Sequence, residues 1–145
     1  MSGSAIRALG LDLGSKRVGV AIGDRTGTIA SPLQVIQRSG SIRRDHEVIA
    51  KLVSEEEADI VVVGLPLNMN GSSGPAALAA IDEAAALATV VGVPVVTFDE
   101  RRTTVTADQA MIEANMRAQA RRRIVDKIAA AVMLQNWLDA GGPGR

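Results

Sequence analysis

The chain has no cysteine among its 145 residues, a single histidine and almost no aromatic side chains. The absence of cysteine excludes disulfides, thiolate metal sites and cysteine nucleophiles. The only two aromatic residues are Phe98 and Trp137, which argues against recognition of nucleic-acid bases by stacking. No apolar run approaches the roughly 20 residues that a membrane-spanning helix needs. The N-terminal Met-Ser-Gly-Ser also lacks the basic region and apolar core of a signal peptide. We therefore expect a cytoplasmic protein that does not contact a membrane.

An excess of charge of either sign is missing as well, because 16 basic residues balance 16 acidic ones. The charges are nevertheless unevenly distributed along the chain. Residues 114–130 contain one acid, Asp126, and a group of five bases: Arg117, Arg121, Arg122, Arg123 and Lys127. The sequence thus predicts a locally positive surface, suited to a polyanion, on a protein without net charge.

The hydrophobic pattern predicts one α/β domain over residues 1–145, with disordered tails at 1–6 and 141–145. Short apolar runs separated by turn residues indicate antiparallel strands in the first forty residues, and Pro32 suggests that the third is an edge strand. Helical spacing and β-branched runs then alternate. The predicted strands are Leu9–Leu13, Val18–Ile22, Thr28–Ile36, Asp59–Gly64 and Val93–Phe98. The predicted helices are one through about Glu57, Pro75–Val91, Thr104–Ala114 and Arg121–Ala140. This order gives a mixed five-stranded sheet flanked by helices.

Three acidic positions stand out because they fall at the ends of core elements. Asp12 interrupts the first apolar strand, where an ionised carboxylate is costly unless it is paired or bound to a cation. Asp99 and Glu100 directly follow a strand, and alternation directs only one of them inward. Asp126 is expected to open the last helix, at the head of an apolar stripe. Each position also has a structural explanation: a turn cap, a polar loop paired with neighbouring arginines, or an acid at a helix N-terminus.

Taken together, carboxylates from distant parts of the chain suit a hard divalent cation such as Mg²⁺ or Mn²⁺. Two-metal phosphodiester cleavage needs such carboxylates and neither a histidine nor a cysteine nucleophile. His46, the only histidine, is expected on a charged helix face beside Arg44 and Asp45, without a functional role.

Four segments carry a family resemblance: Gly10–Ala21, Val62–Gly71, Phe98–Thr104 and Val125–Leu134. In this order they resemble the motifs of the YqgF/RuvX family, and they span nearly the whole chain. The resemblance implies a ribonuclease H-like fold and a divalent-metal-dependent nuclease. It maps the family's acids onto Asp12, Glu100 and Asp126, with Asp99 as a further metal ligand. Unlike the wider RuvC-type pattern, the strand ending at Gly64 carries no acid, so the metal cluster must take its second acid from Asp99-Glu100.

The resemblance leaves two substrates open. The family is linked to maturation of the 5′ end of pre-16S ribosomal RNA, whereas some members are described as Holliday junction resolvases. A resolvase would need a homodimer to cut two strands symmetrically. The backbone contacts and the chemistry serve either a ribosomal RNA precursor or branched DNA, so the sequence does not discriminate between them.

Candidate nucleic-acid contacts come from loops and from the basic segment. Lys16 and Arg17 could hold a phosphate, and the amides of Asn68 and Asn70 could face a backbone or a base edge. The remaining candidates are arginines: Arg101, Arg121, Arg122 and Arg123. Simple turn chemistry and a solvated helix entry are the alternatives.

Two other functional classes compete with a nuclease. A binding module could keep the fold without catalysis, although the presence of all three acids favours an enzyme. Actin-like and sugar-kinase ATPases also open with an Asp-Leu-Gly strand. Those proteins close two such domains around ATP, and 145 residues accommodate only one of them.

Overall fold

The computed structural model describes residues 6–66, 74–99 and 118–142. Within them the chain forms five strands and three helices, and the predicted helix Thr104–Ala114 lies outside this part. The strands are β1 (Ala8–Leu13), β2 (Arg17–Gly23), β3 (Ala30–Gln37), β4 (Ile60–Leu65) and β5 (Val95–Asp99). The helices are α1 (Ile42–Glu55), α2 (Pro75–Val91) and α4 (Ala118–Asp139). None of the helices described is long and apolar enough to cross a membrane.

The strands form one mixed sheet in the order β3-β2-β1-β4-β5. β1, β2 and β3 are antiparallel neighbours, as the closely spaced hairpins predict. β4 pairs parallel with β1, and β5 pairs parallel with β4. β3 is an edge strand, in agreement with the prediction from Pro32. The three parallel strands therefore end at the same edge of the sheet, where ligands of α/β proteins gather.

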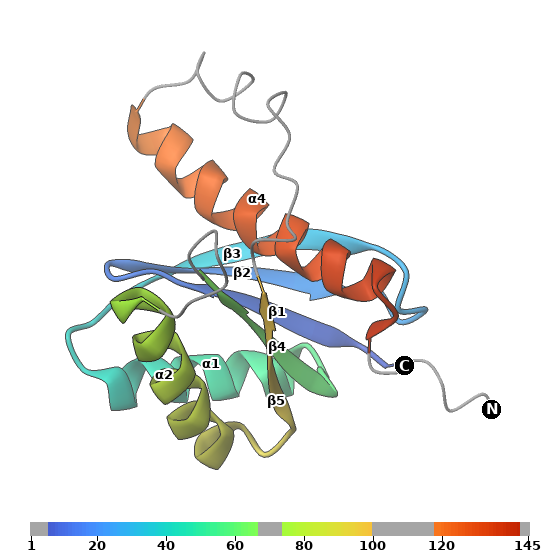
Figure 1. Cartoon of the computed structure of the whole chain (residues 1–145), viewed down its shortest axis with the longest axis horizontal. Helices are drawn as coiled ribbons and strands as arrows, with labels where there is room; N and C mark the ends of the chain where they lie inside the picture. The colour runs from blue at the N-terminus through green and yellow to red at the C-terminus, as the bar shows by residue number, and fades with distance from the viewer. Residues whose placement is uncertain (1–5, 67–73, 100–117, 143–145) are drawn as a thin grey trace.

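The sheet separates two cores, as Figure 1 shows by the helices on its two sides. α1 and α2 cover one face, where Leu9, Leu11 and Val61 pack with Ile49 and Leu87. Of the helices described, α4 covers the other face, and its side chains form the second core with Ala8 and Val62. Because neighbouring residues of a strand point to opposite faces, every position in β1 and β4 can be assigned to one core or the other.

Local signals explain the boundaries of α1 and α2. Ser41 is the N-cap of α1, and its side chain accepts a hydrogen bond from the Arg44 amide. Pro75 stands in the first turn of α2, and Gly92 ends that helix in the left-handed conformation.

Two expectations from the sequence need correction. Asp126 does not open the last helix, because α4 already begins at Ala118. Ala-Gln-Ala followed by arginines is a run of strong helix formers with no breaker, so the helix extends further toward its N-terminus. His46 does not lie on a solvated face, because it is 2% exposed.

Candidate active site

Asp12 is the fifth of the six residues of β1, near the carboxyl end of the strand. Leu11 belongs to the core of α1 and α2, so alternation assigns Asp12 to the α4 face. Gly10, two residues earlier, confirms this assignment because it lies against Leu134 of α4. Asp12 is partly exposed and has interacting partners. Asp12 thus stands at the edge where the parallel strands end, on the face that α4 covers.

Glycines occupy the strand positions on both sides of Asp12. Gly19 of β2 is its direct partner in the antiparallel ladder. On the other side, Leu11 pairs with Val63, so Gly64 of β4 is level with Asp12. Since a glycine contributes no side chain, the α4 face of the sheet is bare on either side of this carboxylate. Neither neighbouring strand therefore places a side chain beside this carboxylate on the α4 face.

The turn after β1 is tightly hydrogen-bonded. The Gly14 amide donates to the carbonyl oxygens of Asp12, at 3.1 Å, and Arg17, at 2.9 Å. A Cβ at position 14 would lie 2.5 Å from the Arg17 carbonyl oxygen, so this turn requires glycine. Lys16 in the turn is exposed, whereas Arg17 is partly buried and engaged. Both basic residues consequently stand within a few positions of Asp12, at the same edge.

Asp99 lies at the same edge but belongs to the opposite face. It is the last residue of β5 and pairs with Leu65. Val96 and Phe98 pack in the α4-side core, so alternation assigns Asp99 to the side of α1 and α2. The strand register therefore separates Asp99 from Asp12. Asp99 has partners of its own.

α4 runs antiparallel to β1. A Cβ on Gly10 would meet Leu134, and a Cβ on Gly23, which lies beside Ala8, would be 3.9 Å from Leu138. Four helical residues advance about 6 Å, close to the roughly 6.6 Å that two strand residues advance. Moving toward the N-terminus of α4 thus leads toward the carboxyl end of β1. The next turn contributes Ala130, a fully buried small residue, near the level of Asp12.

The remaining predicted site residues lie outside the part of the chain that is described in detail. Position 126 belongs to α4, eight residues after its start, but nothing is described of its side chain. The same holds for the side chains of Arg121, Arg122 and Arg123. Glu100, Asn68, Asn70 and Arg101 fall outside the described residues altogether. Among the described side chains, no group of three or more histidines and acids could hold a metal ion.

A buried charged cluster, which the sequence analysis did not predict, lies next to the turn between β1 and β2. It consists of Arg38, Asp45, His46 and Glu83. The guanidinium of Arg38 donates to both carboxylate oxygens of Glu83, at 2.6 and 2.9 Å. The Glu83 carboxylate also lies 2.9 Å from Nε2 of His46. Asp45 accepts from the Ser39 amide at 3.0 Å and is 3.7 Å from Arg38. Asp45 and His46 are buried, at 3% and 2% exposed, whereas Arg38 and Glu83 are partly buried.

The electrostatics of this cluster favour ionised carboxylates. Burial alone would raise the pKa of Glu83, but hydrogen bonds from Arg38 and His46 and the charge of Arg38 hold it below its usual value. Burial likewise opposes ionisation of Asp45, and the Ser39 amide together with Arg38 lowers its pKa overall. The Glu83 carboxylate in turn raises the pKa of Arg38. The cluster is thus a charged network with mutually satisfied partners.

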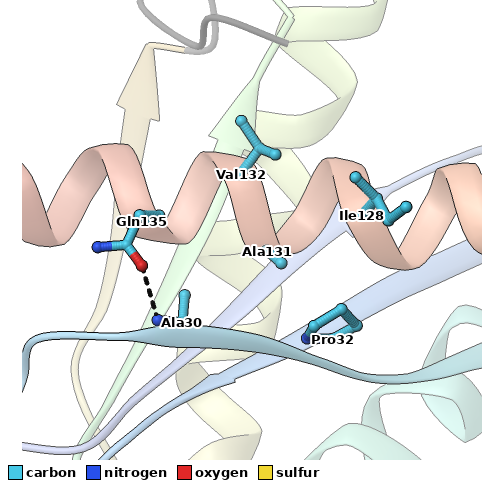
Figure 2. A pocket seen from close by; sticks show the side chains of 6 residues that line it. All are labelled: Ala30, Pro32, Ile128, Ala131, Val132 and Gln135. Atoms are coloured by element: carbon cyan, nitrogen blue, oxygen red, sulfur yellow. Dashed lines mark hydrogen bonds between the residues drawn. The ribbon is translucent and has the colours of Figure 1, made fainter. Parts of the chain in front are cut away.

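A pocket of about 280 Å³ lies between α4 and the edge strand β3 (Figure 2). Its lining is mainly apolar: Ala30, Pro32, Ile128, Ala131, Val132 and Gln135. The Gln135 amide is already occupied, because its oxygen accepts from the Ala30 amide and its nitrogen donates to the Thr28 carbonyl. The side chain thereby closes part of the free edge of β3.

Comparison with solved structures defines the class of fold. RuvC of Thermus thermophilus aligns with a TM-score of 0.59 at 15% identity, covering 94% of this chain and 97% of that one. RuvC in complex with a Holliday junction substrate aligns equally well, with a TM-score of 0.59 at 16% identity. The chain therefore has the ribonuclease H-like fold that the sequence motifs imply.

Sequence comparison then places it within this class. The chain belongs to the RuvX family, described as Holliday junction resolvase, whose pattern matches residues 6–140. A relative from Myxococcus xanthus is 44% identical over 138 residues, covering 95% of this chain and 91% of its own length. One from Thermoanaerobacter pseudethanolicus is 41% identical over 136 residues, covering 93% and 97%. Both relatives carry the name "Putative pre-16S rRNA nuclease".

Proposed function

We propose that this protein is a divalent-metal-dependent endonuclease that acts in the cytoplasm on the 5′ end of pre-16S ribosomal RNA. The observation that carries the proposal is Asp12, a carboxylate between two glycines at the carboxyl edge of the sheet, on the face toward which α4 runs. The names of the relatives support the RNA substrate. The Holliday junction in the family's description makes branched DNA the second candidate, which would require a homodimer.

Asp12, Glu100 and Asp126 are the proposed metal ligands. Glu100 is the residue after Asp99, and continued alternation would turn it to the α4 face, where Asp12 lies. Position 126 is one helical turn before Ala130 and on the same side of α4. Asp99, on the other face, is the weaker candidate for a direct ligand. All these donors are carboxylate oxygens, and the glycines beside Asp12 leave space, so the set fits Mg²⁺ or Mn²⁺.

The bound metal would activate a water molecule and stabilise the leaving oxygen of a phosphodiester. The chain's own residues would bind and orient the nucleic acid. We propose that Lys16 and Arg17, which lie close to Asp12 in the chain, contact phosphates next to the cleaved bond. Further contacts are proposed for residues outside the described side chains: Asn68, Asn70, Arg101, Arg121, Arg122 and Arg123.

The test is a cleavage assay with three labelled substrates in Mg²⁺ or Mn²⁺: a pre-16S 5′ fragment, an unrelated single-stranded RNA and a four-way DNA junction. The parent should cut the pre-16S fragment fastest. Asp12→Asn should lower the rate at least about 100-fold, since metal positioning and charge stabilisation supply most of the rate in this chemistry. Asp82→Asn changes an exposed aspartate on α2 and serves as the matched control.

Three results would contradict the proposal. Equal cleavage rates for the parent and Asp12→Asn would show that Asp12 has a structural and not a catalytic role. Cleavage that persists in EDTA would show that the reaction does not need a divalent metal. Faster cleavage of the four-way DNA junction than of the pre-16S fragment would identify branched DNA as the substrate.

A further inference from the structure

Arg38 holds the turn that follows Asp12 at two points. Its backbone amide donates to the Lys16 carbonyl at 2.9 Å. Its side-chain Nε donates to the Gly14 carbonyl at 3.0 Å. The Gly14 amide in turn donates to the carbonyl of Asp12. The backbone of Gly14 therefore connects the Arg38 guanidinium, which its carbonyl oxygen binds, with the carbonyl of the proposed metal ligand, which its amide binds.

The far side of the guanidinium is fixed in the interior. Two parallel hydrogen bonds to Glu83 use the planar fork of the arginine, a geometry that lysine cannot reproduce. His46 and Asp45 surround the same pair from α1, so both α1 and α2 contribute to holding Arg38. Buried, doubly bonded ion pairs of this kind are rigid and geometrically specific. The turn is thereby attached to two helices on the opposite face of the sheet from Asp12.

A second arginine provides an internal comparison. Arg7 donates from Nε to the Gly23 carbonyl at 3.1 Å and pairs with Glu56 at 3.3 Å. It makes the same kinds of contact as Arg38, a backbone carbonyl and a carboxylate, and it is also partly buried. Arg7 immediately precedes β1, at the sheet edge opposite Asp12. The two arginines thus share a structural role and differ in their distance from the proposed active site.

We propose that Arg38, held by Glu83, is a positioning residue that fixes the turn carrying Asp12, Lys16 and Arg17 for metal and phosphate binding. This inference rests on the proposed function for its catalytic consequence. The buried cluster makes the turn a rigid platform, so that Asp12 meets the metal in one orientation. Loss of the supports around metal ligands typically lowers metal affinity or activity about 10–100-fold.

The experiment compares Arg38→Lys with Arg7→Lys in the full-length protein. Each change keeps a positive charge and removes the contact from Nε to a carbonyl oxygen. For Arg38→Lys we expect kcat to fall about 10–100-fold, with a smaller change in KM, and Mn²⁺ to bind more weakly. Amide hydrogen exchange at Gly14 should accelerate, because the turn loosens. Arg7→Lys should lower the melting temperature by a comparable amount without altering kcat, Mn²⁺ affinity or exchange at Gly14.

Glu83→Gln is the second variant, in case Arg38→Lys does not fold. It keeps the shape of the side chain but weakens the hold on the guanidinium, and it should show the same pattern with a smaller amplitude. Equal kcat and Mn²⁺ affinity in Arg38→Lys and the parent would overturn the proposal, as would equal losses in the Arg7 and Arg38 variants. Mn²⁺ binding and amide exchange need no substrate. A parent that cleaves nothing would therefore count against the proposed function, while these two measurements would still decide the role of Arg38.

Discussion

Gly10 and Leu134 bring the sheet and α4 into close contact, because a Cβ on Gly10 would lie only 2.9 Å from the Leu134 Cβ. Real Cβ atoms do not come that close, so any larger residue at position 10 must move the helix. Gly10 is also two residues from Asp12, on the same face of β1. The glycine therefore determines how near α4, which carries Asp126, can come to the strand that carries Asp12.

Gly10→Ala should accordingly affect both stability and activity. Overpacking of this interface should lower the free energy of unfolding by about 1–3 kcal/mol, measured by urea denaturation. Cleavage should fall even under conditions where the variant is fully folded, because the carboxylates on β1 and α4 move apart. Gly23→Ala is the control, since its Cβ would meet Ala8 and Leu138 atoms only at ordinary contact distances of 3.5–3.9 Å. Equal activity of the two folded variants would contradict the proposed coupling of α4 to the site.

Asp12→Asn should change the response of thermal stability to metal. In EDTA its melting temperature should equal or exceed that of the parent, because crowded carboxylates repel one another when no cation is bound. At a metal concentration 100 times the dissociation constant, the parent should melt roughly 5–10 °C higher than in EDTA. The variant should lose most of this increase. A parent that is not stabilised by Mg²⁺ or Mn²⁺ would argue against a metal site at Asp12.

The three consecutive arginines of α4 are predicted to bind phosphates. Changing Arg121, Arg122 and Arg123 to alanine should weaken binding of unrelated nucleic-acid sequences about equally. The log–log dependence of affinity on salt should become shallower by about 2–3 units if all three contact phosphates. A matched triple variant removes Arg25, Arg43 and Lys51, whose side chains are 65%, 89% and 76% exposed on other elements. If the salt dependence of affinity has the same slope in the two triple variants, the α4 arginines are ordinary solvated residues that do not contact phosphates.

The buried cluster predicts a specific acid sensitivity. The folded-state pKa of Glu83 lies below its ordinary value of 4.5, so the unfolded chain binds the proton more readily. The stability that this carboxylate contributes is therefore complete above about pH 4.5 and is lost as the pH falls through the lowered value. Glu83→Gln should be less stable than the parent at pH 7, and the difference should shrink below pH 4 in pH-dependent urea denaturation. Glu47→Gln, at a side chain 62% exposed, should show no such convergence.

The sequence was sufficient to predict most of the fold, because the informative signals are local. The apolar runs correspond to β1, β2, β4 and β5, and Pro32 identified the edge strand. The start of α4 could not be located, since no cap or breaker stands between Ala118 and Ile128 and the apolar stripe begins only beyond it. Because α4 begins earlier than predicted, one structural explanation for Asp126, an acid at a helix N-terminus, no longer applies. An acid eight residues into a helix gains little from the helix dipole, which acts within the first turn.

The site was predictable only in part. Asp12 could be recognised as an acid within an apolar strand, whereas the glycines beside it become meaningful only through the strand register. The burial of His46 could have been inferred, because it precedes Ile49 and Val53 by three and seven residues on the apolar side of α1. The pairing of Arg38 with Glu83 could not, because 45 residues separate them and neither stands in a recognisable motif.

The position of α4 in the chain has a consequence for synthesis. α4 follows every strand of the sheet, and among the described elements it is the one that covers this face. From Asp99 at the end of β5 to Asp139 at the end of α4, a ribosome adds 40 residues, which takes about 2–8 s. During that interval the helix that covers Ala8, Val62 and Phe98 is missing. The nascent chain then exposes an apolar surface that is prone to aggregation. Under the proposed function, the same delay would keep an incomplete nuclease from cutting RNA, because Asp126 is synthesised as part of this last helix.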